Sequence, residues 1–113
     1  EGDVPRIVDY PMRAVAIGDD LCILSLPYET FCEYQLYAVE VSPFEHTIVL
    51  AYSMGGFVYV ATAADYDRNA RVDYEAGLTG NSLDNRYGLP LDASAEGIIK
   101  EGIRRLLNGL KGQ

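Results

Sequence analysis

Glu29 is the carboxylate whose position most favours a chemical role. It follows an apolar run and Pro27, at or before the first turn of an expected helix. Backbone N–H groups and the helix dipole at such a position keep a carboxylate ionised. A fixed, ionised carboxylate can bind a metal ion or orient a base. The same position also suits an acid that only stabilises the helix, and spacing alone leaves both roles open.

The chain offers few residues that could assist Glu29 in catalysis or in binding a metal ion. His46 is the single histidine, beside Pro43 and Glu45 at an expected helix-to-strand turn. One histidine does not build a usual zinc site, so His46 is expected to be a surface or turn residue. The serines have no nearby histidine as base, and no Gly-x-Ser-x-Gly elbow, P-loop or Gly-x-Gly-x-x-Gly motif occurs. Nucleophilic catalysis within this chain is therefore not expected.

Tyrosine is in excess, with nine Tyr against three Phe and no Trp. Because a tyrosine side chain is apolar with a polar tip, this excess suggests cleft walls or interfaces. Tyr59 lies in the apolar segment 57–61, and its hydroxyl needs a partner on the face that it would share with Phe57 and Ala61.

Length and composition fit one folded domain spanning residues 1–113. Hydrophobic residues make up 49% and charged residues 23%, as in globular domains. The net charge of −8 argues against nucleic acid and against an anionic membrane surface as partners. No apolar run reaches the roughly 18 to 20 residues of a transmembrane helix. Cys22 and Cys32 form no Cys-x-x-Cys motif, and whether they are bonded to each other is left open.

Short apolar runs predict the strands that would position these residues. Residues 12–17 and 21–26 flank Gly18-Asp19-Asp20 and predict a β-hairpin. Residues 46–52 and 57–61 are rich in β-branched and aromatic side chains and predict a second antiparallel pair across a Gly-Gly break.

Three helices are expected between and after these strands. Apolar residues at three- and four-residue steps predict a helix from Tyr28 or Glu29 to Ser42. Thr62 is expected to cap a short helix through Tyr66, with Asp65 completing a weak capping box. A C-terminal helix is predicted over 94–110, with Ser94 as its cap. Its apolar stripe contains Ile98, Ile99, Ile103, Leu106, Leu107 and Leu110.

Together these elements predict an α+β fold. It would be a two-layer sandwich of a small, mostly antiparallel sheet with a central helix and a C-terminal helix. Residues 1–11 are expected to be an extended lead-in, and residues 67–93 a long loop. A loop of that length is usually functional or supported by a partner.

Three segments, read in order, resemble a known family. They are AVAIGDDLCILSLPYETFCEYQL (14–36), HTIVLAYSMGGFVYVATAADY (46–66) and DYEAG (73–77). Their order and spacing are similar to the C-terminal part of the neutral/alkaline ceramidase-like family, over roughly residues 13–110. The family has a Pro-Gly-Glu-x-Phe motif after a strand, then a Tyr-x-x-Thr segment and a Tyr-Glu pair.

The resemblance implies a zinc-dependent amidase that hydrolyses N-acyl-sphingosine lipids. The family's zinc is held by two His, one Glu and one Tyr, and the motifs place the last two on Glu29 and Tyr59. Thr62 matches the motif Thr, and Tyr74 and Glu75 match the Tyr-Glu pair, as possible supporting residues. Zinc would polarise the amide carbonyl and lower the pKa of a water molecule.

The chain departs from the family pattern at several positions. Tyr28 replaces the Gly of Pro-Gly-Glu, Ala61 a frequent Pro, and Val72-Asp73 a frequent Gly-Gly. The family's two His ligands and its serine lie in an N-terminal region that these residues do not include. The isolated chain is therefore expected to be inactive and to hold no zinc, and that N-terminal region is its expected partner.

Two alternatives to an amidase portion remain at this point. One is a family relative that has lost catalysis and acts as a binding or assembly module, which Tyr28 and the missing histidines motivate. The other is a small α+β domain that dimerises through its tyrosine-rich face. Members of the family are mostly secreted or envelope-associated, which gives the expected location, although Glu1-Gly2-Asp3 shows no signal-peptide pattern.

Overall fold

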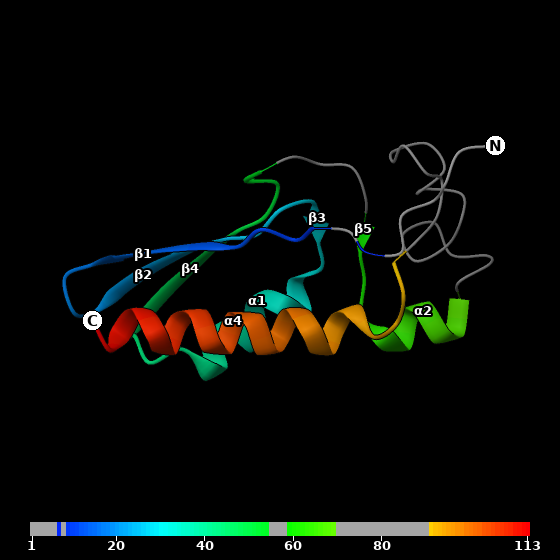
Figure 1. Ribbon diagram of the computed structural model, residues 1–113. Helices are drawn as coiled ribbons and strands as arrows, with labels where there is room; N and C mark the ends of the chain where they lie inside the picture. The colour runs from blue at the N-terminus through cyan, green and yellow to red at the C-terminus, as the bar shows by residue number, and fades with distance from the viewer. Residues whose placement is uncertain (1–6, 8, 55–58, 70–90) are drawn as a thin grey trace.

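The structure is a computed structural model that describes residues 7, 9–54, 59–69 and 91–113 (Figure 1). The described residues form a small mixed β-sheet, a separate pair of short strands and three helices, which confirms the α+β class. The strands are β1 (Arg13–Ile17), β2 (Leu21–Ser25), β3 (Glu29–Thr30), β4 (His46–Leu50) and β5 (Tyr59–Val60). The helices are α1 (Cys32–Val41), α2 (Ala63–Asn69) and α4 (Ala95–Lys111).

The predicted hairpin is present, but the sheet around it is mixed rather than mostly antiparallel. β1 and β2 pair antiparallel from Arg13↔Ser25 to Ile17↔Leu21, and Gly18 takes the left-handed conformation (φ 67°) that the turn requires. β4 lies parallel to β2, in the sheet order β1-β2-β4. Because α1 connects β2 to β4, the chain crosses over the sheet and returns in the same direction.

Both long helices lie on the same side of this sheet (Figure 1). α4 packs on β1 and on α1, and α1 packs on β4. Inward side chains of β2, β5, α1 and α4 form the main core with side chains of nearby loops. Its fully or almost fully buried members are Cys22, Leu24, Leu26, Tyr34, Ala38, Phe44, Val60, Ile99, Ile103 and Leu107. The opposite side of the sheet carries no helix among the described residues.

The amphipathic stripe predicted for α4 is largely correct. Ile99, Ile103 and Leu107 are buried, and Leu106 and Leu110 pack against the core from its margin. Ile98 is an exception, since 70% of it is exposed. Ser94 is the N-cap residue but makes no side-chain capping bond. The Asp92 carboxylate instead accepts a hydrogen bond from the Ser94 N–H at 2.9 Å.

One predicted strand pairing and two predicted boundaries are wrong. The segment around Tyr59 pairs with β3, in parallel, and not with β4. The segment after Pro27 is extended, so the helix begins at Cys32 and not at Tyr28 or Glu29. α2 continues to Asn69, beyond the predicted end at Tyr66. Most of the predicted 67–93 loop lies outside the described residues, as do residues 1–6 and 8 of the predicted 1–11 lead-in.

Candidate functional site

The structure brings the two predicted zinc ligands together. β3 and β5 pair in parallel with Glu29 opposite Tyr59 and Thr30 opposite Val60. Neighbouring strands lie about 4.8 Å apart, and side chains at paired positions project from the same face of a sheet. Both Glu29 and Tyr59 are half-buried. The carboxylate and the phenol therefore start from adjacent backbone positions on one face, although 30 residues of sequence separate them.

Strand pairing, and not a helix terminus, positions Glu29. The prediction that free N–H groups of a helix hold its carboxylate is wrong, because the first turn of α1 begins three residues later at Cys32. The backbone of residues 29–31 is instead engaged by β5, since the Phe31 N–H donates to the Val60 carbonyl at 3.0 Å. This ladder ends in the extended Phe31, and α1 then leads away from the site.

Tyr28 has a left-handed backbone, with φ 63°, at the position where the family motif has glycine. Glycine adopts this conformation without steric cost, whereas an L side chain costs about 1–2 kcal/mol. Contacts of the side chain and backbone hold Tyr28 there. Its hydroxyl donates to the Asp9 carbonyl at 2.8 Å, its ring meets Tyr10 edge-on at 5.8 Å, and its carbonyl accepts from the Tyr52 N–H at 3.0 Å. These contacts thus hold a left-handed turn at a residue that is not glycine.

Two buried tyrosines, Tyr34 and Tyr66, fix the backbone of β5. The Tyr66 hydroxyl donates to the Tyr59 carbonyl at 3.1 Å and accepts from the Ala61 N–H at 2.9 Å. The Tyr34 hydroxyl donates to the Ala61 carbonyl at 2.7 Å. Burial raises the pKa of Tyr66 to about 12 and also raises the pKa of Tyr34, so both phenols stay protonated donors at neutral pH. The sequence predicted neither role, because the tyrosine excess indicated only cleft walls or interfaces.

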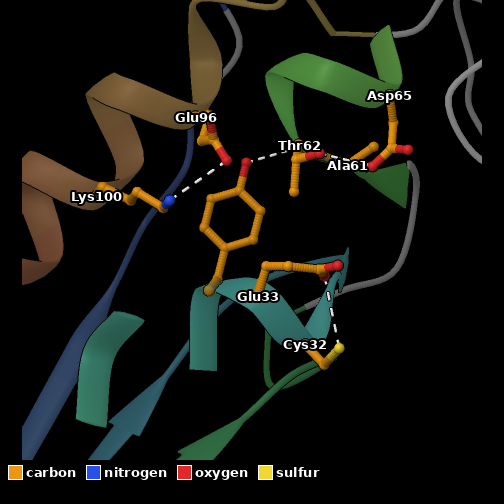
Figure 2. Close-up of polar contacts among 8 residues, drawn as sticks. Cys32, Glu33, Ala61, Thr62, Asp65, Glu96 and Lys100 are labelled. Carbon is orange, nitrogen blue, oxygen red and sulfur yellow. Dashed lines mark hydrogen bonds and ion pairs between the residues drawn. The ribbon is translucent and has the colours of Figure 1, made fainter. Parts of the chain in front are cut away.

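Thr62 follows this clamped segment and begins α2. Its hydroxyl donates to the Asp65 carboxylate at 2.6 Å, and its carbonyl accepts from the Asp65 N–H at 3.1 Å (Figure 2). The predicted capping box is therefore replaced by a contact between the two side chains. Thr62 thus orients the turn after β5. Its predicted companions Tyr74 and Glu75 lie outside the described residues.

His46 lies at the opposite end of the sheet. It begins β4, opposite Leu21, whereas Leu50 at the far end of β4 approaches the site through its carbonyl, which accepts from the Leu26 N–H at 2.8 Å. A strand of this length separates its two ends by about 13 Å. His46 is exposed, and its imidazole Nε2 lies 3.7 Å from a Glu45 carboxylate oxygen, as expected of a surface residue. The described residues contain no cluster of three or more His, Cys, Asp or Glu side chains suited to a metal.

A pocket of about 150 Å³ opens beside β3 and the start of α1. It is lined by Leu26, Thr30, Phe31, Cys32, Gln35, Val49 and Ala51. The Thr30 hydroxyl donates to the Pro27 carbonyl at 2.9 Å, so the Tyr10 hydroxyl donates to it at 2.7 Å. A space equal to roughly five water molecules is too small for a lipid chain.

Cys32 and Cys22 are both free thiols. Cys22 is buried in the core, while Cys32 is exposed at the first turn of α1. The Cys32 thiol donates to the Glu33 carboxylate at 3.5 Å (Figure 2), and this hydrogen bond raises the thiol pKa. A raised pKa reduces the thiolate fraction and makes Cys32 a poor nucleophile or zinc ligand.

No family model, curated protein or solved structure matches this chain. The described part of the chain also has no helix long and apolar enough to cross a bilayer. The geometry of the strand pair is therefore the main observation on which a function can rest.

Proposed function

We propose that this chain is the part of a zinc-dependent amide hydrolase that supplies Glu29 and Tyr59 as metal ligands. The enzyme class is the one implied by the resemblance to the ceramidase-like family, with N-acyl-sphingosine lipids as substrates. The observation that carries the proposal is the register Glu29↔Tyr59 in the β3–β5 pair. Two residues matched to metal ligands on motifs far apart in sequence are neighbours in the fold.

The donor chemistry of this pair fits zinc. A carboxylate oxygen is a common zinc ligand at about 2.0–2.2 Å, and a phenol offers a second oxygen. Catalytic zinc sites use at least three protein ligands, so Glu29 and Tyr59 form only part of one. When bound, zinc acts as a Lewis acid toward the amide carbonyl and lowers the pKa of water. The remaining ligands in this proposal are histidines of another polypeptide region, since His46 is remote.

The chain's own residues would keep the two ligands in place before metal arrives. Tyr66 bonds the backbone on both sides of Val60, which fixes the direction of the Tyr59 side chain. The turn at Tyr28 directs the chain into β3 and so determines the backbone position of Glu29. Preorganised ligands bind metal and substrate without a further ordering cost.

The test is amide hydrolysis by the polypeptide that joins this chain to the histidine-bearing region, supplied with Zn²⁺. Glu29→Gln and Tyr59→Phe are each expected to lower kcat at least about 100-fold, because each removes a ligand oxygen. Glu33→Gln is the matched control, since this carboxylate is exposed and bonds Cys32 instead, and it should leave kcat within about twofold. Undiminished hydrolysis in both ligand variants would refute the assignment.

A further inference from the structure

Strand β4 forms one edge of the sheet in the described structure, and this edge exposes backbone hydrogen-bonding groups. β4 pairs with β2 on one side and follows it at the end of the order β1-β2-β4 (Figure 1). The His46 N–H points toward β2, where it donates to the Asp20 carbonyl at 2.9 Å. Because backbone groups of successive strand residues point to opposite sides, those of Thr47 and Val49 point away from β2. Such a row of N–H and C=O groups is a template for another strand.

Helix α1 runs beside β4 in the opposite direction. At one end, the hydroxyl of Thr47 near the start of β4 donates to the hydroxyl of Ser42, which follows α1, at 2.6 Å. At the other end, Cys32 in the first turn of α1 and Ala51 just after β4 line the same pocket. The pocket of about 150 Å³ therefore lies where the end of β4 meets the beginning of α1.

One side of α1 continues from this pocket along β4. Cys32, Gln35 and Val39 follow the i, i+3, i+7 spacing that places residues on one side of a helix. Cys32 and Gln35 line the pocket, and Val39 lies on the same side one turn further along α1, with 51% of it exposed. None of the three carries a formal charge at neutral pH. A strand added to β4 would therefore meet uncharged side chains of α1.

The pocket matches one large apolar side chain in size. A cavity of about 150 Å³ with apolar walls holds a six-carbon ring such as benzene. Leu26, Phe31 and Val49 supply apolar wall here, and the described lining residues include no charged side chain. An edge strand beside a side-chain pocket is the combination by which domains bind extended peptides. The strand's hydrogen bonds supply affinity in that mode, and the pocket supplies specificity.

We propose that the outer edge of β4 binds an extended peptide segment of another protein, which adds a strand to the sheet and places one large apolar side chain in the pocket. The net charge of −8 favours a segment with basic rather than acidic flanks. The same charge opposes pairing of β4 with a second copy of this chain. The site goes beyond the proposed function, because peptide binding at β4 needs no metal ion. A five-residue edge and one pocket make a small interface, so the complex is transient.

The test selects peptides that bind this chain from a phage-displayed library of random dodecapeptides. Selected peptides are expected to carry apolar residues at alternate positions, since successive side chains of a strand face opposite sides. After synthesis, a bound peptide should slow amide hydrogen exchange at Thr47 and Val49, whose N–H groups then have strand partners. Exchange in β1, the other edge strand of the described sheet, should stay unchanged.

Two variants and a control test the side-chain contacts of the peptide. Ala51→Leu fills the pocket from an exposed position, and Val39→Lys places a charge beside the added strand. Each should weaken peptide binding at least about fivefold, measured by isothermal titration calorimetry. Ile98→Lys is matched to Val39→Lys, because it replaces an apolar residue that is 70% exposed on α4, and it should leave the affinity within about twofold.

Several results would overturn the proposal. A library that yields no enriched peptide would do so, as would a bound peptide that leaves exchange at Thr47 and Val49 unchanged. Unaltered affinity in both Ala51→Leu and Val39→Lys would place the peptide elsewhere. A dimer of the free chain that protects the same two amides would make a second copy the occupant. The exchange measurement uses the unchanged protein, so it decides the question even where a variant does not fold.

Discussion

Tyr28 and Tyr66 show how single residues shape the candidate site from outside it. Tyr28 has an unfavourable φ of 63° at the turn that leads into β3. Tyr66 holds β5 in place through two hydrogen bonds to the backbone. Neither role follows from sequence spacing. The motif of the family that the chain resembles has glycine at this position, and glycine is the residue type that a left-handed turn favours.

The left-handed backbone at Tyr28 predicts an unusual order of variant stabilities. Tyr28→Gly should be more stable than Tyr28→Ala by about 1 kcal/mol, since both lose the side-chain contacts but only glycine avoids the steric cost. At Phe31, where φ is −63°, Phe31→Ala should instead be more stable than Phe31→Gly. Urea unfolding of the four variants measures this. If Tyr28→Ala were equal to or more stable than Tyr28→Gly, the backbone at residue 28 would not be left-handed.

Buried phenols predict a loss of stability at high pH. Burial raises the pKa of Tyr66 to about 12, against about 10 in the unfolded chain, so between these values the folded state retains a proton that the unfolded state loses. The contribution is fully present below pH 10 and decreases by up to about 1.4 kcal/mol per pH unit as the pH rises toward 12.

The variant that tests this effect is Tyr66→Phe. Denaturant unfolding from pH 9 to 12 should show a shallower decline in stability for Tyr66→Phe than for the unchanged protein. Equal slopes in the two proteins would mean that Tyr66 ionises as freely when folded as when unfolded.

At the scale of elements, local patterns predicted the structure well and non-local pairings did not follow from them. The β1–β2 hairpin and α4 rest on signals within a few residues, a Gly-Asp turn and an amphipathic stripe. The pairing predicted for the β5 segment was wrong because its actual partner, β3, has only two residues and so no periodicity in the sequence. Because β3 was not recognised, the start of α1 was predicted too early, and Glu29 was assigned to a helix terminus that it does not occupy.

The glycines of helix α4 differ in how closely neighbouring side chains approach them. A Cβ at Gly97 would meet no atom within 4 Å, whereas a Cβ at Gly102 would lie 2.5 Å from the Met12 Cε atom. Gly97→Ala should therefore stabilise the chain by about 0.5–1 kcal/mol, through helix propensity alone. Gly102→Ala should stabilise the chain by less than Gly97→Ala, since the Met12 side chain must move to make room for the new Cβ. Thermal unfolding followed by circular dichroism tests the order, and a larger gain at Gly102 would contradict the α4–β1 packing.

At the scale of the whole described structure, a buried core lies between a small sheet and two helices. Among the described residues, helices cover this sheet on one side only, and the separate strand pair places Glu29 opposite Tyr59. The resemblance assigns Glu29 and Tyr59 to one site, but their strand pairing was not predicted, because it depends on contacts across 30 residues. The position of both helices on one side of the sheet could not be anticipated either, since it follows from packing between elements and not from any local pattern.

The most direct test of the central claim is the zinc content of purified protein after dialysis. The polypeptide that includes the histidine-bearing region should retain about one zinc per chain, and Glu29→Gln or Tyr59→Phe should lower its zinc affinity about 10- to 100-fold. Glu33→Gln should retain the metal, and the isolated chain should retain none, because two ligands are too few. Full zinc retention in both ligand variants, or stoichiometric zinc bound by Glu29 and Tyr59 in the isolated chain, would contradict the account.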